Sequence, residues 1–128
     1  PQALGVQIAN PDETVVALTG DGGIGYHIAD LETAVREELP LTVIVLNNDG
    51  LGSSKASQQA TDAFELSTDF AAGVDYAQIA RGFGCQAARV DEPERFVDEL
   101  EQALDSDEPT LLDVQVDPYA LPPIIVEN

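Results

Sequence analysis

Two short apolar runs stand out along the chain, and each is followed by a turn built from glycine, aspartate and asparagine. The first run covers residues 15–19 and the second covers residues 41–46. Both are continuously apolar and rich in β-branched residues, and neither alternates between apolar and polar positions. This pattern is typical of strands that are buried on both faces of a parallel sheet. We therefore predict two inner strands, each of which ends at a polar turn.

A segment with helical spacing separates the two runs. Apolar residues recur every three or four positions between residues 28 and 39, charged residues occupy the other positions, and Pro40 closes the segment. This spacing predicts a helix with one apolar face. The strand, the helix and the second strand together have the length that a parallel crossover needs. The residues on the inward face are Ile28, Leu31, Ala34, Val35 and Leu39.

The same alternation continues toward the end of the chain. It predicts a helix at 76–83 that ends at Gly84, a strand at 86–90, a helix that begins at Pro93, and a strand at 110–116. The inward positions of the helix after Pro93 are Phe96, Val97, Leu100 and Leu104. We further predict the last part of a helix at 2–9, a helix with a loop within 50–73, and a tail after Pro118 that crosses the surface. Alternating strands and helices indicate an α/β fold, a doubly wound parallel sheet with helices on both faces, in one domain over residues 1–128.

The chain is strongly acidic. Its 128 residues include 24 Asp and Glu but only 5 Lys and Arg, which gives a formal net charge of −19. Such a surface repels nucleic acid and anionic membranes, so we expect neither as a partner. The acidic residues are scattered and do not form a tail. We interpret them as an adaptation to high salt and expect a halophilic source; an ordinary acidic protein is the alternative.

Several features bear on where the protein works. The single cysteine, Cys85, cannot form an internal disulfide, which suits a cytoplasmic location. No apolar run approaches the length of about 20 residues that a membrane span needs. The first residues carry no signal-peptide pattern. The chain does not begin with Met, and we expect it to be a piece of a longer protein.

The two polar turns carry the candidate chemistry. In an open parallel sheet, ligands bind beyond the carboxyl ends of the strands, where both turns are expected to lie. Asp21 offers a carboxylate and Asn48 offers a neutral amide oxygen, and such hard oxygen ligands suit Mg²⁺ or Ca²⁺. Mg²⁺ typically takes one or two carboxylates and shares its other positions with phosphate oxygens and water. Backbone N–H groups at the start of the following helix are placed to meet a phosphate, namely those of Gly22, Gly23 and Ile24.

The pairing of these turns resembles the signature of thiamine-diphosphate enzymes. In that signature Gly-Asp-Gly is followed about two dozen residues later by Asn-Asn; here Gly20-Asp21-Gly22 precedes Asn47-Asn48, with 24 residues between Gly22 and Asn47. The fuller pattern, from Thr19 through Gly52, is similar to the acetolactate synthase and benzoylformate decarboxylase group. Further similar stretches are residues 8–11, 68–71 and 113–117, so the resemblance covers nearly all of the chain.

The resemblance implies a specific set of ligands. Asp21 and Asn48 would bind Mg²⁺ through their side chains, and Gly50 would bind it through its backbone carbonyl. The Mg²⁺ would hold the diphosphate of thiamine diphosphate. The other residues expected to contact the cofactor are Gly20, Gly22, Gly23, Ile24, Leu51 and Gly52.

The resemblance also implies an enzyme larger than this chain. Members of the group are three-domain enzymes that decarboxylate 2-oxo acids, and the product is protonated or joined to an acceptor. A glutamate on a separate pyrimidine-binding domain, usually of a second subunit, activates the cofactor, and the enzymes are homodimers or homotetramers. We therefore expect this chain alone to be inactive, and we assign no catalytic acid or base in it.

Other interpretations remain open at this stage. The main alternative is a non-catalytic doubly wound module that holds Mg²⁺ and phosphate, similar to a response-regulator receiver. A receiver needs a lysine opposite its phosphorylated aspartate, whereas the only lysine here, Lys55, lies in an irregular segment. An assembly domain with a decayed site is another. Asn47 is interpreted as a turn residue that braces the site. His27 either faces the reaction centre or is an ordinary helix residue, and Cys85 is interpreted as a small buried hydrophobe.

Overall fold

The computed structural model describes residues 1–61, 68–71 and 73–118. The tail predicted after Pro118 lies outside these residues from position 119 onward. Within the described part, four parallel strands form one sheet in the order β1-β2-β4-β3. The strands are β1 (Val15–Gly20), β2 (Leu41–Asn47), β3 (Gln86–Val90) and β4 (Thr110–Gln115). The helices are α1 (Gln2–Ala9), α2 (Asp21–Gly25), α3 (Asp30–Arg36), α4 (Gly52–Ala60), α5 (Tyr76–Phe83) and α6 (Pro93–Leu104).

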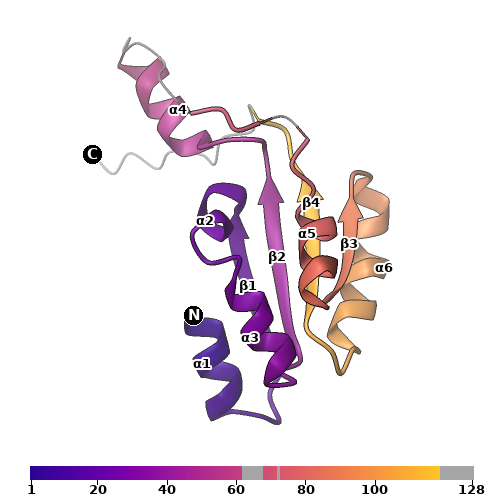
Figure 1. The fold of residues 1–128 in the computed structure, drawn as a ribbon. Coiled ribbons are helices and arrows are strands. Elements are labelled where there is room, and N and C mark those ends of the chain that lie inside the picture. The colour runs from indigo at the N-terminus through magenta and orange to yellow at the C-terminus, as the bar shows by residue number, and fades with distance from the viewer. Residues whose placement is uncertain (62–67, 72, 119–128) are drawn as a thin grey trace, which may run out of the picture.

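Helices cover both faces of the sheet, as predicted. One face packs against α1, α2, α3 and α5, and its core includes Leu31, Val43 and Leu111. The other face packs against α6, with Ile44, Ala103 and Leu112 at the contact. Figure 1 shows α4 beyond the tips of the strand arrows. The α/β fold and the order of its strands and helices are therefore those that the hydrophobic pattern predicts.

Burial of β1 on both faces was a wrong prediction. Side chains alternate along β1, and Val16 and Leu18 on one face are 45% and 67% exposed. By contrast, the central strand β2 is buried at every position except Leu46. The two sequences are equally apolar, but β1 lies at the edge of the sheet. α6 packs against β3 and β4, and within the described residues it leaves this face of β1 uncovered.

Two details of the helices also differ from the prediction. The segment after Asp21 forms α2 and α3 with a turn at 26–29 between them, and not one continuous helix. Three of the five residues of α2 are glycines, which are poor helix formers, so the first helix ends after a single turn or so. In α6, Phe96 and Leu100 pack on the sheet, whereas Val97 and Leu104 are 58% and 39% exposed. Ala103 is the buried residue of this helix.

Candidate functional site

The register of β1 and β2 brings the two polar turns to the same level; the first turn is residues 20–23, at the end of β1, and the second turn is residues 47–52, at the end of β2. Gly20, the last residue of β1, pairs with Leu46 of β2. Asp21 therefore follows the end of β1 at the level of Asn47, the last residue of β2. A hydrogen bond joins the turns, because the backbone N–H of Gly50 donates to the side-chain oxygen Asp21 Oδ2 at 2.8 Å. The structure thus brings together Asp21 and Gly50, two of the three residues predicted to form a metal site.

Asp21 is a buried carboxylate that is held by backbone groups on both sides. Its side chain accepts from the N–H of Gly22 at Oδ1 and from that of Gly50 at Oδ2, each at 2.8 Å. Only 3% of the residue is exposed. A buried charge is costly unless it is paired or hydrogen-bonded. These two bonds fix the orientation of the carboxylate between the two turns.

Asn48, the third predicted ligand, lies against the same group. Its side-chain oxygen faces two other oxygens, the Gly50 carbonyl oxygen at 2.7 Å and Asp21 Oδ1 at 3.3 Å. Two arrangements remove the repulsion among these three oxygens. The amide can turn over, so that its NH₂ group donates to both oxygens, or a cation can lie among the three.

The two distances from the Asn48 oxygen, to the Gly50 carbonyl oxygen and to Asp21 Oδ1, suit the ligands of a small divalent cation. Adjacent ligands of an octahedral Mg²⁺, each about 2.1 Å from the metal, lie about 3 Å from one another. The set contains one carboxylate, one amide oxygen and one backbone carbonyl oxygen. The described residues contain no group of three or more His, Cys, Asp or Glu side chains that could hold a metal ion. A cation at this point would therefore rely on Asp21 for charge and on neutral oxygens and a bound anion for the rest.

Backbone hydrogen bonds to the segment at 68–70 fix the conformation of the second turn. Asp49 has a positive φ of 58°, and its carbonyl oxygen accepts from the N–H of Phe70 at 2.8 Å. The N–H of Leu51 donates to the carbonyl oxygen of Thr68 at 2.7 Å. A Cβ on Gly50 would lie 2.5 Å from that same Thr68 oxygen. Glycine at position 50 therefore lets its own carbonyl stay next to Asp21.

Two residues that the sequence did not mark as part of the site form hydrogen bonds that support the two turns. Asp113 of β4 is fully buried and accepts from Asn47 Nδ2, and Tyr76 of α5 donates from its hydroxyl to the Asp21 carbonyl oxygen. Burial raises the pKa of Asp113. Burial and then the nearby Asp21 raise the pKa of Tyr76, so its hydroxyl stays protonated and able to donate. The one available signal was a charged residue within the otherwise apolar run at 110–114.

Comparison with known proteins identifies the family of this fold and site. The family described as "Thiamine pyrophosphate enzyme, C-terminal TPP binding domain" matches residues 1–114. The chain belongs to this family. Thiamine pyrophosphate is another name for thiamine diphosphate, the cofactor that the sequence resemblance implied.

Individual relatives of this thiamine pyrophosphate-binding domain include enzymes with different names. Acetolactate synthase of Bacillus subtilis is 35% identical over 117 residues, which are 91% of this chain and 20% of the relative. The 2-hydroxyacyl-CoA lyase of rice is 32% identical over 118 residues, which are 88% of this chain and 20% of the relative. The solved structure of the thiamine diphosphate-dependent 4-hydroxybenzoylformate decarboxylase of Rhodococcus jostii RHA1 aligns with a TM-score of 0.81 at 32% identity, covering 90% of this chain and 21% of that chain. The chain spans about a fifth of the length of these relatives.

The remaining predicted site residues of this thiamine pyrophosphate-binding domain lie around the first turn. Gly20 ends β1, and Gly22, Gly23 and Ile24 belong to α2. The side chain of Ile24 is buried in the core, so this residue can offer only its backbone to a ligand. A Cβ on Gly22 would lie 2.6 Å from a methyl group of Leu51, which shows that Leu51 packs directly on the first turn.

His27 and Cys85 lie apart from this constellation. His27 lies in the turn between α2 and α3, more than half of its side chain is exposed, and its Nδ1 is 3.9 Å from Asp30 Oδ2. It lines a cavity of 710 Å³ between α1, β1 and α3. Cys85 is buried, as predicted, and burial raises its pKa to about 11. Its thiol is therefore protonated at neutral pH and a poor nucleophile.

Gly52 offers a way to disturb Asn48 selectively. A Cβ at position 52 would meet the Asn48 amide nitrogen too closely, whereas a Cβ at Gly25 would meet nothing within 4 Å. We expect Gly52→Ala to push the Asn48 side chain away from Asp21 and to weaken Mg²⁺-dependent binding of thiamine diphosphate about tenfold. Because alanine suits the first turn of α4, thermal unfolding should show little loss of stability. Gly25→Ala is the matched control; equal affinity of the two variants in calorimetry would contradict this account of Asn48.

Proposed function

We propose that this domain binds the diphosphate of thiamine diphosphate through a Mg²⁺ ion held by Asp21, Asn48 and Gly50. The observation that carries the proposal is the convergence of three oxygens: the Gly50 carbonyl oxygen and Asp21 Oδ1 lie 2.7 and 3.3 Å from the side-chain oxygen of Asn48. Asp21 would supply the negative charge, and the other two residues would supply neutral oxygens. The diphosphate would complete the coordination.

The charge of the chain supports a role for the metal. A diphosphate carries several negative charges, and the chain itself has a net charge of −19. The only lysine, Lys55, forms an ion pair with Asp69 at 3.0 Å. A divalent cation between Asp21 and the diphosphate would offset the electrostatic repulsion between the diphosphate and the acidic domain, which has few Lys and Arg side chains to do so. The backbone of Gly22, Gly23 and Gly52 would then lie along the diphosphate.

We further propose that the whole enzyme is a 2-oxo acid decarboxylase or carboligase similar to acetolactate synthase. When bound, thiamine diphosphate supplies the carbon centre that adds to the substrate carbonyl and accepts the charge left by loss of carbon dioxide. The residues of this domain would anchor and orient the cofactor. Because relatives at 32–35% identity include both a synthase and a lyase, the substrate would be selected by residues outside the anchor. The activating glutamate would come from a pyrimidine-binding domain, in a homodimer or homotetramer.

The receiver-like alternative is not favoured by the contacts of its key residues. A receiver needs a lysine next to its phosphorylated aspartate, and Lys55 pairs with Asp69 in the segment after α4. The match of this chain to the thiamine pyrophosphate enzyme family also argues against a receiver. Each helix in the described part of the chain is too short or too polar to span a membrane.

Isothermal titration calorimetry tests the proposed function. Thiamine diphosphate is titrated into the chain with and without Mg²⁺, and thiamine itself serves as the control ligand. We expect binding of the diphosphate only when Mg²⁺ is present, and no binding of thiamine under either condition. Equal binding with and without Mg²⁺ would contradict the proposed coordination, and phosphate transfer from acetyl phosphate to Asp21 would favour a receiver.

A further inference from the structure

The buried carboxylate of Asp113 in β4 accepts hydrogen bonds from groups on three elements of the fold. Its Oδ1 accepts from Asn47 Nδ2 and from Gln115 Nε2, and its Oδ2 accepts from the backbone N–H of Tyr76, each at 3.0 Å. Arg89 on the neighbouring strand β3 donates to Gln115 Oε1 at 3.0 Å and lies near enough to favour the charged form of Asp113. None of Asp113 is exposed. A carboxylate so deeply buried needs these donors, and it fixes their positions in return.

One of these bonds leads to the second turn of the site. Asn47 donates to Asp113 Oδ1 and also to the carbonyl oxygen of Val74, so its amide cannot rotate freely. With its NH₂ group committed to these two acceptors, its oxygen accepts from the N–H of Asp49 at 3.1 Å. This last bond helps to hold Asp49 at its positive φ of 58°. That conformation turns the chain so that Asn48 and the Gly50 carbonyl face Asp21.

Another bond leads to the first turn of the site. The backbone N–H of Tyr76 donates to Asp113 Oδ2, which fixes the start of α5 against β4. The side chain of the same residue reaches the first turn, where its hydroxyl donates to the Asp21 carbonyl oxygen at 3.3 Å. Tyr76 is only 6% exposed, so the phenol ring is packed along its length. Asp113 is thereby linked through one residue to each of the two turns that carry the oxygens.

From these contacts we infer that Asp113 is a positioning residue for the cation, and that it acts on the second turn through Asn47 and on the first turn through Tyr76. This inference rests on the proposed function, because it explains how the three oxygens keep the spacing that Mg²⁺ requires. Octahedral Mg²⁺ tolerates little distortion of its ligand geometry. Residues that orient ligands in this way typically change metal affinity by about 10- to 100-fold when they are replaced.

Two variants separate the links of this network. Asp113→Asn keeps the size of the side chain but replaces one acceptor with an NH₂ donor, which then faces another donor on Asn47 or Tyr76. We expect it to weaken Mg²⁺ binding, measured at a fixed excess of thiamine diphosphate, about 10- to 100-fold.

Tyr76→Phe removes only the hydroxyl and leaves the backbone bond to Asp113 in place. We expect it to weaken Mg²⁺ binding roughly 3- to 10-fold. The matched control is Tyr26→Phe, because Tyr26 is 84% exposed in the turn after α2 and should have no effect.

A purely structural role predicts a different result. If Asp113 and Tyr76 position the cation, both variants should recover full binding of thiamine diphosphate when Mg²⁺ is raised, and the double variant should lose less than the sum of the two single effects. A structural defect would instead lower the binding capacity at every Mg²⁺ concentration.

Urea unfolding of each variant without Mg²⁺ measures its stability separately from its affinity for Mg²⁺. If Asp113→Asn does not fold, the Mg²⁺ affinity of Tyr76→Phe alone tests the inference. Mg²⁺ affinities equal to that of the unmodified chain would overturn the inference and leave the proposed function intact. Failure of the unmodified chain to bind thiamine diphosphate with Mg²⁺ would instead contradict the proposed function.

Discussion

Replacing Asp21 with asparagine is expected to abolish Mg²⁺-dependent binding of thiamine diphosphate. The substitution removes the only carboxylate among the three converging oxygens. It also places an NH₂ group against the backbone N–H of Gly22 or of Gly50, both of which donate to Asp21 in the structure. Because loss of a residue that merely orients a ligand costs about 10- to 100-fold in metal affinity, loss of the charged ligand itself should cost at least about 100-fold. Calorimetric titration of Mg²⁺ at a fixed excess of thiamine diphosphate measures the change.

Asp49→Asn is the matched control for this variant. Asp49 lies on the second turn, close to the site, and the substitution removes the same charge. Asparagine tolerates the positive φ of position 49, so the turn should keep its conformation. We expect the affinity for Mg²⁺ to change by no more than about threefold, which is the scale of a screened charge near a surface. A larger loss in Asp49→Asn than in Asp21→Asn would mean that the wrong carboxylate has been assigned.

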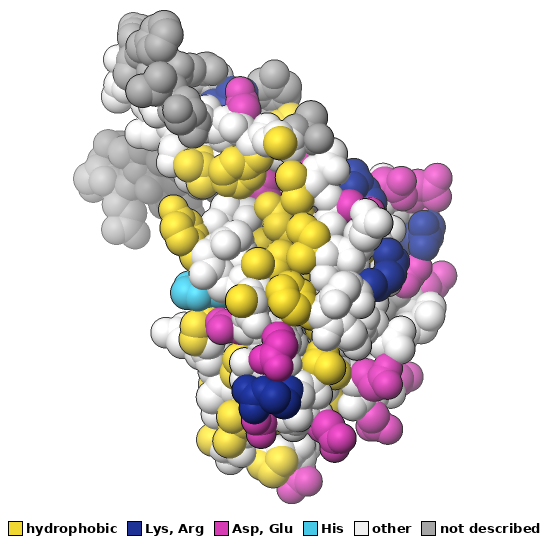
Figure 2. All heavy atoms as spheres, viewed as in Figure 1, with side chains coloured by type: hydrophobic (Ala, Val, Ile, Leu, Met, Phe, Trp, Pro, Cys, Tyr) yellow, Lys and Arg dark blue, Asp and Glu magenta, His cyan; other side chains and the backbone are white. Residues whose placement is uncertain are grey.

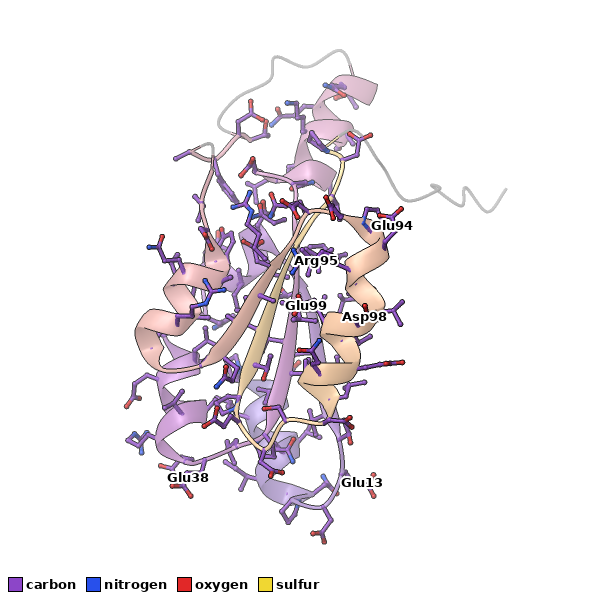
Figure 3. All side chains as sticks on the ribbon, turned by 90° about the vertical axis from the view of Figure 1, so that its right-hand side faces the viewer. Glu13, Glu38, Glu94, Arg95, Asp98 and Glu99 are labelled. Atoms are coloured by element: carbon purple, nitrogen blue, oxygen red, sulfur yellow. The ribbon has the colours of Figure 1, made fainter. Side chains whose placement is uncertain are left out.

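The second large effect is expected from salt. The chain carries a net charge of −19, and acidic side chains are spread over the face shown in Figure 2. Figure 3 shows Glu94 and Asp98 along α6, while Glu13 and Glu38 lie at the other end of the domain. Raising the salt from 0.1 M to 1 M shortens the Debye length from about 10 Å to about 3 Å, which screens repulsion between such residues. Relief of about 2 kcal/mol would raise the unfolding temperature by on the order of 10 °C. Thermal unfolding in increasing KCl measures this change.

Charge-reduced variants show whether screening is the cause. Glu38 lies in the turn after α3 and Asp98 lies on α6. Both are exposed acids, and Glu38→Gln together with Asp98→Asn removes two negative charges. We expect the double variant to be more stable than the unmodified chain at 0.1 M KCl and to approach it at high KCl. The Arg95–Glu99 ion pair, at 2.5 Å along the same helix as Asp98, remains in both proteins. An equal salt dependence in the two proteins would point to general salting-out and not to relief of repulsion.

Strongly marked elements could be predicted from the sequence to within a residue or so. The helix at 76–83 combines an apolar face with Gly84, which ends it in a left-handed conformation with φ of 99°. The strand predicted at 41–46 is observed at 41–47; it is apolar except for Thr42 and Asn47, and it lies between two neighbours. In both cases the local pattern and the tertiary surroundings require the same structure. Agreement between these levels is what makes a segment predictable from its own residues.

The burial of β1 could not be predicted in the same way. Its residues are as apolar as those of β2, but burial depends on which elements lie next to a strand. The pattern of residues 15–19 carries no information about how far α6 extends across the sheet. Val16 and Leu18 are therefore exposed in the described structure despite their apolar character.

The site was predictable as far as its residues follow directly from strand ends. Asp21, Asn48 and Gly50 come after two adjacent strands, and their convergence follows once those strands are paired. Asp113 and Tyr76 reach the turns from positions distant in sequence, and Asp113 is 66 residues from Asn47. A buried aspartate in a strand and a tyrosine at a helix start carry no local mark of their partners. Only the three-dimensional structure shows that these residues support the two turns.

A crystal structure of the domain with Mg²⁺ and thiamine diphosphate would show how the diphosphate is held. We expect one cation about 2.1 Å from Asp21 Oδ1, from the Asn48 side-chain oxygen and from the Gly50 carbonyl oxygen, with diphosphate oxygens completing its coordination. A diphosphate bound without a cation at these three oxygens, or a cation held by other residues, would rule out the proposed Mg²⁺ site.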